Sequence, residues 1–420
     1  MMKKRLLVLM LVCAAVVTPF AGYGLSGQRA DENLLSVQGG KGLLSVQAKE
    51  KKTDNKTDMK SVQTFGYQLM EQYLSQENPV LSPVSAYVML GMAGNGAKGA
   101  TKKEFEKVLG SDMLSVSESI MNTLPQEKEG AQLTIANSAW MDNLFTPQKK
   151  WLGTAKKQFQ SDVFQTDLDT AAAKKKINQW VSNRTSKLIP KLLEEKLDKN
   201  TRLALVNALY FHADWKQQFV PEVTRKADFK LDDGTIVKAD MMHATMYGCG
   251  YFKNKKAEGV VLPYKDSSFA FAAIKPSGGE SIRDWYHSVS AAELAAFAAD
   301  SKTQDVKLSL PKFEARCRMK LNNSLKKIGI KKAFDAEKAD FSLIGKSKEN
   351  LYLSFVLQEA VISVAEEGTE AAAATMGAMS GSGMPMEMPS VDFDRSFLYM
   401  IVDMESGAPL FMGILDQPQA

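Results

Sequence analysis

Apolar residues at helical spacing mark the first folded segment of the chain. Val62, Phe65 and Leu69 recur every three to four positions, which predicts a helix that begins near residue 61. A second helix should begin at Ser82, because a capping serine followed by proline is a typical helix start. The same kind of spacing predicts further helices over residues 102–109, 151–159, 171–183, 291–299 and 319–329.

Alternating or continuous apolar runs predict the strands. The run from Leu203 to Tyr210 contains no charged residue, which indicates a strand buried on both faces, and Asn207 is its polar exception. A buried asparagine needs hydrogen-bond partners. Other strands are predicted over residues 133–141, 229–242 with a turn at 232–234, 260–263, 269–274, 307–313, 351–364, 397–402 and 410–415.

A long stretch of small residues follows the strand predicted over residues 351–364. From residue 366 to residue 389 the chain has almost no large side chain except methionine, and a connection of this length is usually functional or disordered. In an extended conformation its first part would have one small, uncharged face, which could enter between existing strands without a clash. A flexible low-complexity connector is the alternative interpretation. This first part consists of Glu366, Glu367, Gly368, Thr369, Glu370, Ala371, Ala372, Ala373, Ala374 and Thr375.

Composition excludes several classes of protein. The 420 residues suffice for a large core in one or two domains, and a net charge of +5 with interleaved acidic and basic residues gives no nucleic-acid footprint. Cys249 and Cys317 are too few for a disulfide scaffold, and no spacing typical of a metal site is present. The three histidines accompany no nucleophile motif, so we expect no enzyme, no metal and no cofactor.

The N-terminus has the pattern of a secretory signal over residues 1–24, with a charged start, a short apolar core and small residues at its end. The apolar core is too short to span a membrane. Cys13 raises the alternative of a lipid-anchored surface protein, which the apolar residues after it disfavour. Residues 25–60 are predicted to be a flexible tail, and residues 61–420 a single domain.

Several motifs in that domain resemble those of the serpins, a family of protease inhibitors whose reactive loop inserts into a sheet. The resemblance covers roughly residues 61–417 and includes the run of small residues described above. The motifs are Ser82-Pro83-x-Ser85, Gly96-Ala97-Lys98-Gly99-x-Thr101, Leu205 to Trp215, Leu310-Pro311-Lys312-Phe313, Leu325 to Phe334 and Pro409 to Gly413.

The resemblance implies an α+β fold. It implies a large, mostly antiparallel central sheet, smaller sheets, about eight to nine helices and an exposed reactive-centre loop at about residues 366–390. Residues 366–375 would be the hinge of this loop, the part that enters the sheet first. Serpin loop insertion is an example of strand addition.

The resemblance also implies a function. The protein would be a secreted, extracellular or periplasmic serine protease inhibitor that is cleaved as a suicide substrate and traps the acyl-enzyme by inserting its loop. Its partners would be serine proteases and some cysteine proteases, held in a covalent acyl complex, and the inhibitor itself would be a monomer without a membrane span. A serpin-fold binding protein without inhibitory activity is the alternative.

Two groups of residues would control insertion in a serpin. Ser82, Ser85, Asn207 and Gln358 match the shutter cluster beneath the insertion site, where Gln358 stands in place of the histidine of many members. Glutamine both donates and accepts, so the cluster can persist without pH sensitivity. Trp215, Lys312 and Glu366 match the breach, where the loop first enters, and the two charged residues should lie close together.

Three peptide bonds are candidates for the scissile bond. They are Met379–Ser380, Ser382–Gly383 and Met386–Glu387. No arginine or lysine lies between residues 370 and 388, so elastase-, chymotrypsin- or subtilisin-like proteases are the expected targets.

Overall fold

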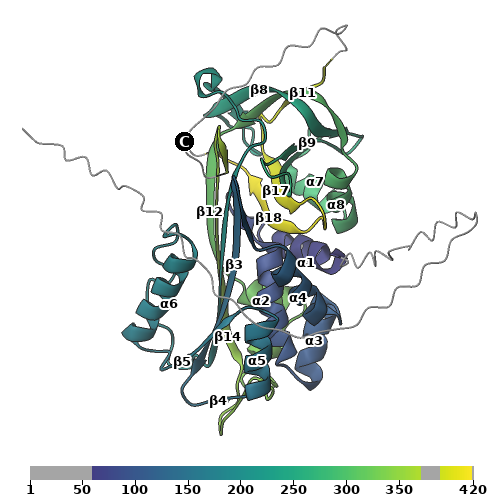
Figure 1. Ribbon diagram of the computed structural model, residues 1–420. Coiled ribbons are helices and arrows are strands. Elements are labelled where there is room, and N and C mark those ends of the chain that lie inside the picture. The colour runs from purple at the N-terminus through teal and green to yellow at the C-terminus, as the bar shows by residue number, and fades with distance from the viewer. Residues whose placement is uncertain (1–58, 370–387, 419–420) are drawn as a thin grey trace, which may run out of the picture. The chain divides into compact units, whose positions relative to one another are not determined.

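The computed structural model describes residues 59–369 and 388–418, which form an α+β domain as predicted (Figure 1). Strands and helices are interspersed along the chain, with one sheet running through the middle of the view in Figure 1. The predicted signal sequence and most of the tail lie outside the described residues.

The central sheet has seven strands in the described part of the chain. In order across the sheet the strands are β12 (Phe313–Lys320), β14 (Leu353–Val364), β15 (Gly368–Thr369), β6 (Leu203–Asp214), β3 (Ala131–Asp142) and β2 (Gln126–Lys128), and β5 (Asp162–Thr166) pairs with β3. Neighbouring strands are antiparallel except for the pairs β14–β6 and β3–β5, which are parallel.

The strand predicted to be buried on both faces is β6. Ala204, Val206 and Ala208 lie in a small buried cluster on one face of the strand. Leu203 and Leu205 belong to the main core on the opposite face. An uninterrupted apolar run is typical of a strand covered on both sides. The prediction for residues 203–210 is therefore confirmed, although the strand continues to Asp214.

A second sheet of nine strands contributes residues to the main core. Its strands are β1 (Val80–Leu81), β18 (Pro409–Leu415), β17 (Phe397–Asp403), β10 (Phe269–Pro276), β9 (Ala257–Pro263), β8 (Ile236–Lys253), β11 (Lys302–Pro311), β16 (Ser390–Asp392) and β7 (Arg225–Lys230). A separate two-stranded sheet joins β4 (Thr146–Pro147) to β13 (Gly345–Lys346).

Nine α-helices occur within the described residues, and they cover the central sheet unequally. Figure 1 shows α6 alone on one side of the sheet, with α1 to α4 on the other. The helices are α1 (Lys60–Glu71), α2 (Pro83–Asn95), α3 (Gly99–Leu109), α4 (Met113–Thr123), α5 (Lys149–Lys157), α6 (Ala171–Arg184), α7 (Ile282–Ser288), α8 (Ala291–Ala299) and α9 (Asn322–Ile328), and two short 3₁₀ turns span Pro221–Val223 and Lys332–Phe334.

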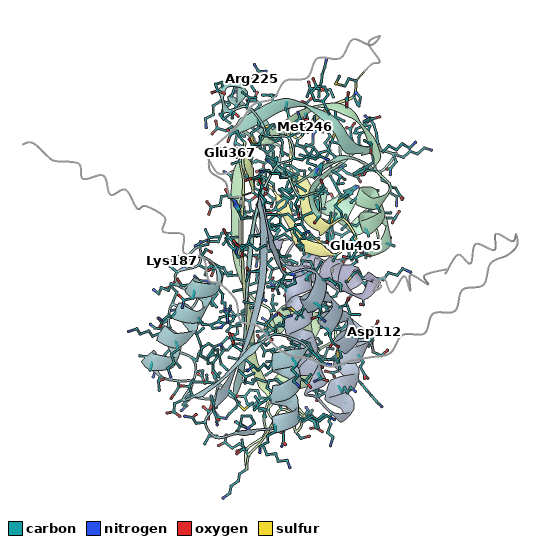
Figure 2. All side chains as sticks on the ribbon, viewed as in Figure 1. Asp112, Lys187, Arg225, Met246, Glu367 and Glu405 are labelled. Atoms are coloured by element: carbon teal, nitrogen blue, oxygen red, sulfur yellow. The ribbon has the colours of Figure 1, made fainter. Side chains whose placement is uncertain are left out.

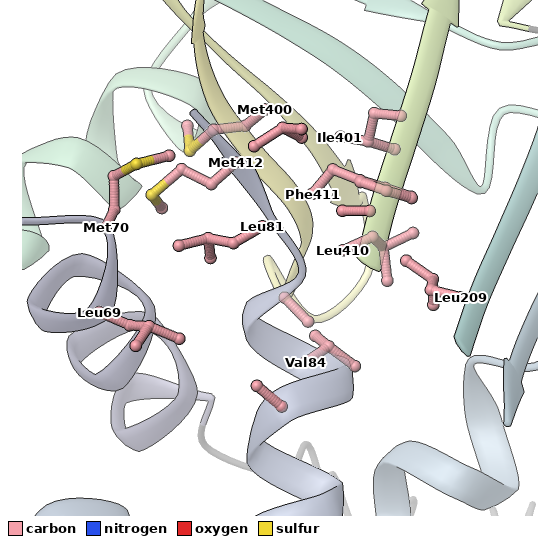
Figure 3. Close-up of a cluster of buried hydrophobic side chains, with 14 of the residues drawn as sticks. Leu69, Met70, Leu81, Val84, Leu209, Met400, Ile401, Leu410, Phe411 and Met412 are labelled. Carbon is pink, nitrogen blue, oxygen red and sulfur yellow. The ribbon is translucent and has the colours of Figure 1, made fainter. Parts of the chain in front are cut away.

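The main core lies between α1, α2 and the two sheets. Figure 3 shows Leu69 of α1, Val84 of α2, Leu209 of β6 and Phe411 of β18 pointing into one buried cluster. Helix α2 begins as predicted, since the Ser82 hydroxyl accepts a hydrogen bond from the N–H of Ser85. Residues 83–94 are all buried, so this helix has no solvent-facing side.

The predicted helix over residues 319–329 is wrong at its start. Residues 313–320 form β12, in which buried residues such as Phe313 and Met319 alternate with exposed ones such as Arg316 and Lys320. This alternation is the period-two pattern of a strand with one covered face. The helix itself is the shorter α9. Helices α4 and α7 and the short strands β1, β2, β4, β5, β13 and β16 were not predicted.

Candidate functional site

The predicted hinge begins inside the central sheet. Gly368 and Thr369 form the two-residue strand β15, which pairs with Asp214 and Ala213 of β6 on one side and, through Thr369, with Val364 of β14 on the other. All three pairings are antiparallel. The first hinge residues therefore already occupy a strand position between β14 and β6.

Glycine is required at residue 368 by the close approach of β6. A Cβ atom on Gly368 would lie 2.2 Å from the carbonyl oxygen of Ala213 and 2.8 Å from the Cα atom of Asp214. Because both neighbours are backbone atoms, any side chain here would push β15 away from β6. The glycine in the sequence thus serves the strand rather than a turn.

Hydrogen bonds from residues 215 and 219 hold the three residues that precede Gly368. The N–H groups of Trp215 and Phe219 donate to the carbonyl oxygens of Glu367 and Glu366, both at 2.9 Å. The indole Nε1 of Trp215 donates to the carbonyl oxygen of Ala365 at 2.8 Å. Residues 365–367 form the turn between β14 and β15, and Figure 2 labels Glu367 at this end of the central sheet.

Lys312 and Glu366, expected to be close, are in contact. The Nζ atom of Lys312 lies 2.8 Å from Oε2 of Glu366, and the hydroxyl of Thr224 donates to Oε1 at 3.0 Å. Burial alone would raise the pKa of Glu366, but the hydrogen bonds from Lys312 and Thr224 hold it below its usual value. The gating role of this pair stays a prediction.

Acid should loosen this contact. The folded-state pKa of Glu366 is lowered, so its stabilisation is complete above the ordinary carboxyl pKa and is lost as the pH falls through the folded-state pKa. Because half of the Lys312 side chain is exposed, the pair contributes at most about 1 kcal/mol, and hinge amide exchange should rise by at most about fivefold.

Hydrogen-exchange mass spectrometry of a peptide spanning residues 365–369, corrected for intrinsic exchange, measures this change. Glu366→Gln should show the loosened hinge already at neutral pH and little further response to acid. A variant as protected and as pH-sensitive as the original protein would contradict the assignment.

A ladder of three buried amide side chains crosses the sheet below the hinge. Gln358 of β14 donates from Nε2 to Oδ1 of Asn207 of β6 at 3.2 Å, and Asn207 donates from Nδ2 to Oδ1 of Asn137 of β3 at 2.9 Å. Gln358 also exchanges two hydrogen bonds with the backbone of Ser82, at 3.0 and 3.1 Å. The predicted cluster therefore includes Gln358, Asn207 and Ser82.

Asn137 was missed by the sequence analysis, whereas Ser85 takes little part in the ladder. Asn137 lies opposite Asn207 in the β3–β6 register, and the presence of polar residues at the middle of two buried strands was the available signal. Ser85 contributes its N–H to the Ser82 hydroxyl, but its own hydroxyl is buried without a hydrogen-bond partner among the described residues.

Comparison with known proteins shows to which family this chain belongs. The sequence model of the serpin (serine protease inhibitor) family matches residues 60–418. The chain belongs to the serpin family. Serpins are mostly protease inhibitors, but the family also has non-inhibitory members.

Individual serpins resemble the chain over nearly its whole folded part. Chicken neuroserpin is 31% identical, with 84% of this chain and 89% of that protein covered. The native state of tengpin, a thermophilic serpin, superimposes with a TM-score of 0.80 at 31% identity, covering 86% of this chain and 94% of that one. Human thyroxine-binding globulin in complex with thyroxine gives a TM-score of 0.76 at 27% identity, covering 86% and 99%.

The seam through which a serpin loop would insert lies between β14 and β6. These strands pair in parallel from Leu353 to Glu359, and among the described residues no pairing between them continues above Glu359 and Ala208. The two strands are therefore joined in their lower half, and β15 lies between them at the upper end.

The connection from α6 to β6, residues 185–202, covers this seam. Ile189 and Leu192 pack in one buried cluster with Val206 of β6 and Leu357 of β14. Arg316 and Arg318 of β12 tie the connection down, since their Nη2 atoms donate to the carbonyl oxygens of residues 188 and 191 at 2.7 and 2.9 Å. Insertion of the loop would require this connection to move.

Residues 370–387 of the loop lie outside the described residues. This applies to hinge residues 370–375 and to every candidate for the scissile bond: Met379, Ser380, Ser382, Gly383, Met386 and Glu387. Their roles stay predictions. No helix of the described residues is long and apolar enough to cross a membrane.

One serine, one histidine and one aspartate do meet in this serpin, but in an order unsuited to catalysis. The hydroxyl of Ser309 lies 2.6 Å from Oδ1 of Asp392 and 3.0 Å from Nδ1 of His243. A nucleophilic serine needs a histidine that is itself oriented by a carboxylate, whereas here the serine lies between the two. In the described part of the chain, no group of three or more histidine, cysteine, aspartate or glutamate side chains could hold a metal ion.

Proposed function

We propose that this serpin is a secreted inhibitor of serine proteases that acts by suicide cleavage. The protease serine attacks the scissile carbonyl of the loop, forms an ester and releases the new amino terminus of the C-terminal fragment. The cleaved loop then inserts between β14 and β6 and carries the acylated protease with it. Distortion of the protease active site prevents water from completing the hydrolysis.

The observation that supports this proposal is the position of β15. Gly368 and Thr369 already pair with both strands of the seam, and the residues that follow are mostly alanine. A chain that continued along the same path would bring Ala371 and Ala373 onto the face of Thr369, since alternate residues of a strand share a face. Small side chains there need little space in the core.

Insertion would also improve the pairing of the sheet. At present β14 and β6 are parallel neighbours over Leu353 to Glu359. An inserted strand would be antiparallel to both, as β15 already is, and antiparallel pairing is slightly more stable per residue. It would also give hydrogen-bond partners to the facing edges of both strands above Glu359. The native state is therefore expected to be metastable, with the inserted state lower in free energy.

The lack of lysine and arginine from residue 371 to residue 387 argues against trypsin-like target proteases. Small and methionine side chains at the candidate bonds suit elastase-, chymotrypsin- or subtilisin-like proteases, and some cysteine proteases are further targets. The signal pattern at the N-terminus supports action outside the cell or in the periplasm. We propose that the inhibitor acts as a monomer.

A non-inhibitory binding protein is the second candidate, and one comparison favours it. Thyroxine-binding globulin, which has a similar fold, is described in complex with thyroxine. A serpin of that kind would have no need for a loop that inserts after cleavage. The hinge of small residues distinguishes the two candidates and favours inhibition.

The test is a denaturing gel of the mature protein mixed with an elastase-type protease, with the released C-terminal peptide weighed by mass spectrometry. We expect a band that survives boiling at the summed mass of protease and inhibitor less the released peptide, and a peptide mass that identifies one of the three candidate bonds. A trypsin-type protease serves as the comparison and should give little complex. Cleavage without a complex across several protease classes would support the non-inhibitory candidate.

A further inference from the structure

Tyr264 contacts Thr369, the last residue of the hinge that the structure describes. It directly follows β9, and its hydroxyl oxygen lies 2.6 Å from Oγ1 of Thr369. Tyr264 is fully buried and Thr369 is 1% exposed, so this hydrogen bond is shielded from water. Buried hydroxyls that lose their partner are costly, which makes the bond a strong constraint on where Thr369 can lie.

The ring of Tyr264 is fixed by two aromatic neighbours. It stacks on Trp215 with 4.7 Å between ring centroids and 4° between ring planes, and it meets Phe211 edge-on at 5.2 Å. The backbones of Trp215 and Tyr264 also form a β-bridge. Offset or edge-on aromatic contacts of this kind restrict the ring, so the hydroxyl is presented at one place.

The Trp215–Tyr264 pair therefore holds both ends of the hinge turn. Trp215 receives the chain through the carbonyl oxygen of Ala365, and Tyr264 receives it through the hydroxyl of Thr369. The turn closes on itself, because the N–H of Ala365 donates to the carbonyl oxygen of Gly368 at 3.0 Å. Below Thr369 lies the upper part of the seam, where β14 and β6 are not paired with each other.

We propose that Tyr264 is a positioning residue for loop insertion, whose hydroxyl recognises a hydroxyl-bearing residue at position 369 and holds the hinge in register before cleavage. This inference deepens the proposed inhibitory function and rests on it. Tyr264 keeps the first inserted pair of residues in place, so that insertion after cleavage continues from a formed strand. Without the hydroxyl, the hinge would leave the sheet more often and insertion would begin later relative to deacylation.

The experiment compares Tyr264→Phe, Thr369→Val and the double variant in the full chain. Both single changes keep the shape of the side chain and remove one hydroxyl. A hydrogen bond contributes about 0.5–1.5 kcal/mol, so hinge amide exchange over residues 365–369 should rise about two- to tenfold in each single variant. The number of inhibitor molecules consumed per protease trapped should rise in the same variants.

The double variant separates a specific contact from general destabilisation. If the two hydroxyls act through one bond, the double variant shows no larger effect than either single variant, because it leaves neither hydroxyl unpaired, instead of showing the product of the two effects. Tyr67→Phe is the matched control, because the Tyr67 hydroxyl on α1 donates to the backbone of Val289 and not to the hinge. It should leave hinge exchange and the consumption ratio unchanged.

The outcomes also separate this inference from the proposed function. If the original protein forms no covalent complex, the inhibitory function fails, and hinge exchange in the same variants still tests whether Tyr264 positions Thr369. If the complex forms but Tyr264→Phe changes neither hinge exchange nor the consumption ratio, the positioning role is overturned. Additive effects in the double variant would overturn it as well.

Discussion

Replacing Thr369 with arginine should convert the protein from an inhibitor into a substrate. The Thr369 side chain is 1% exposed and touches the hydroxyl of Tyr264, so arginine cannot enter this position without burying an unpaired charge. Such burial costs several kcal/mol, and each 1.4 kcal/mol added to the insertion barrier slows insertion tenfold. We expect at least about a tenfold loss of boil-resistant complex, with loop cleavage retained.

Thr369→Ser is the matched control for this change. Serine is small and keeps a hydroxyl for Tyr264, so complex formation should stay within about twofold of the original. The thermal stability of the cleaved forms provides a second measurement: the cleaved original and the serine variant should become more stable, and the cleaved arginine variant should not. A persistent covalent complex with Thr369→Arg would refute the role of position 369 in insertion.

Much of the fold and part of the site could be predicted from local patterns. The uninterrupted apolar run predicted β6 as a strand covered on both faces, and its asparagine, Asn207, lies in a hydrogen-bonded ladder. The serpin resemblance predicted the contact between Lys312 and Glu366. In each case either a periodicity or a motif carried the information within a short stretch of chain.

The features that sequence analysis missed depend on register between distant segments. Asn137 joins the ladder only because β3 pairs with β6 in a register that places it opposite Asn207. Tyr264 reaches Thr369 because its backbone forms a bridge with Trp215. The sequence also could not predict how far the hinge enters the sheet. The run of small residues extends well past Thr369 and contains no local signal for where pairing with β14 and β6 begins.

A buried carboxylate beside the seam, that of Glu359, should affect both the stability of the protein and the rate of spontaneous loop insertion. Glu359 of β14 is 1% exposed. Nε of Arg318 lies 3.2 Å from its Oε2, and Nη1 of Arg316 lies 3.7 Å from its Oε1. The same two arginines hold residues 188 and 191 of the α6–β6 connection. One cluster of charges thus joins β12, β14 and the segment that covers the seam.

The double variant Arg316→Met with Arg318→Met should lower the free energy of unfolding and speed spontaneous loop insertion. It leaves Glu359 buried without an opposite charge, which costs about 3 kcal/mol, at the low end of the usual range because both arginines reach solvent. It also frees the α6–β6 connection. We expect that connection to move before the loop can enter, so the loss should raise the rate of conversion to an inserted, non-inhibitory form by up to roughly a hundredfold.

The measurements are the thermal unfolding midpoint and the half-life of inhibitory activity during incubation without protease. The matched control is Arg316→Lys with Arg318→Lys. It keeps both charges near Glu359, but a lysine cannot contact Glu359 and a carbonyl oxygen of the connection at once as the planar guanidinium does. It should therefore preserve most of the stability while shortening the half-life. If both double variants convert at the original rate, the connection does not limit insertion, and the barrier lies instead in separating β14 from β6. If only the methionine variant converts faster, the charge of Glu359 rather than the hold on the connection governs the seam.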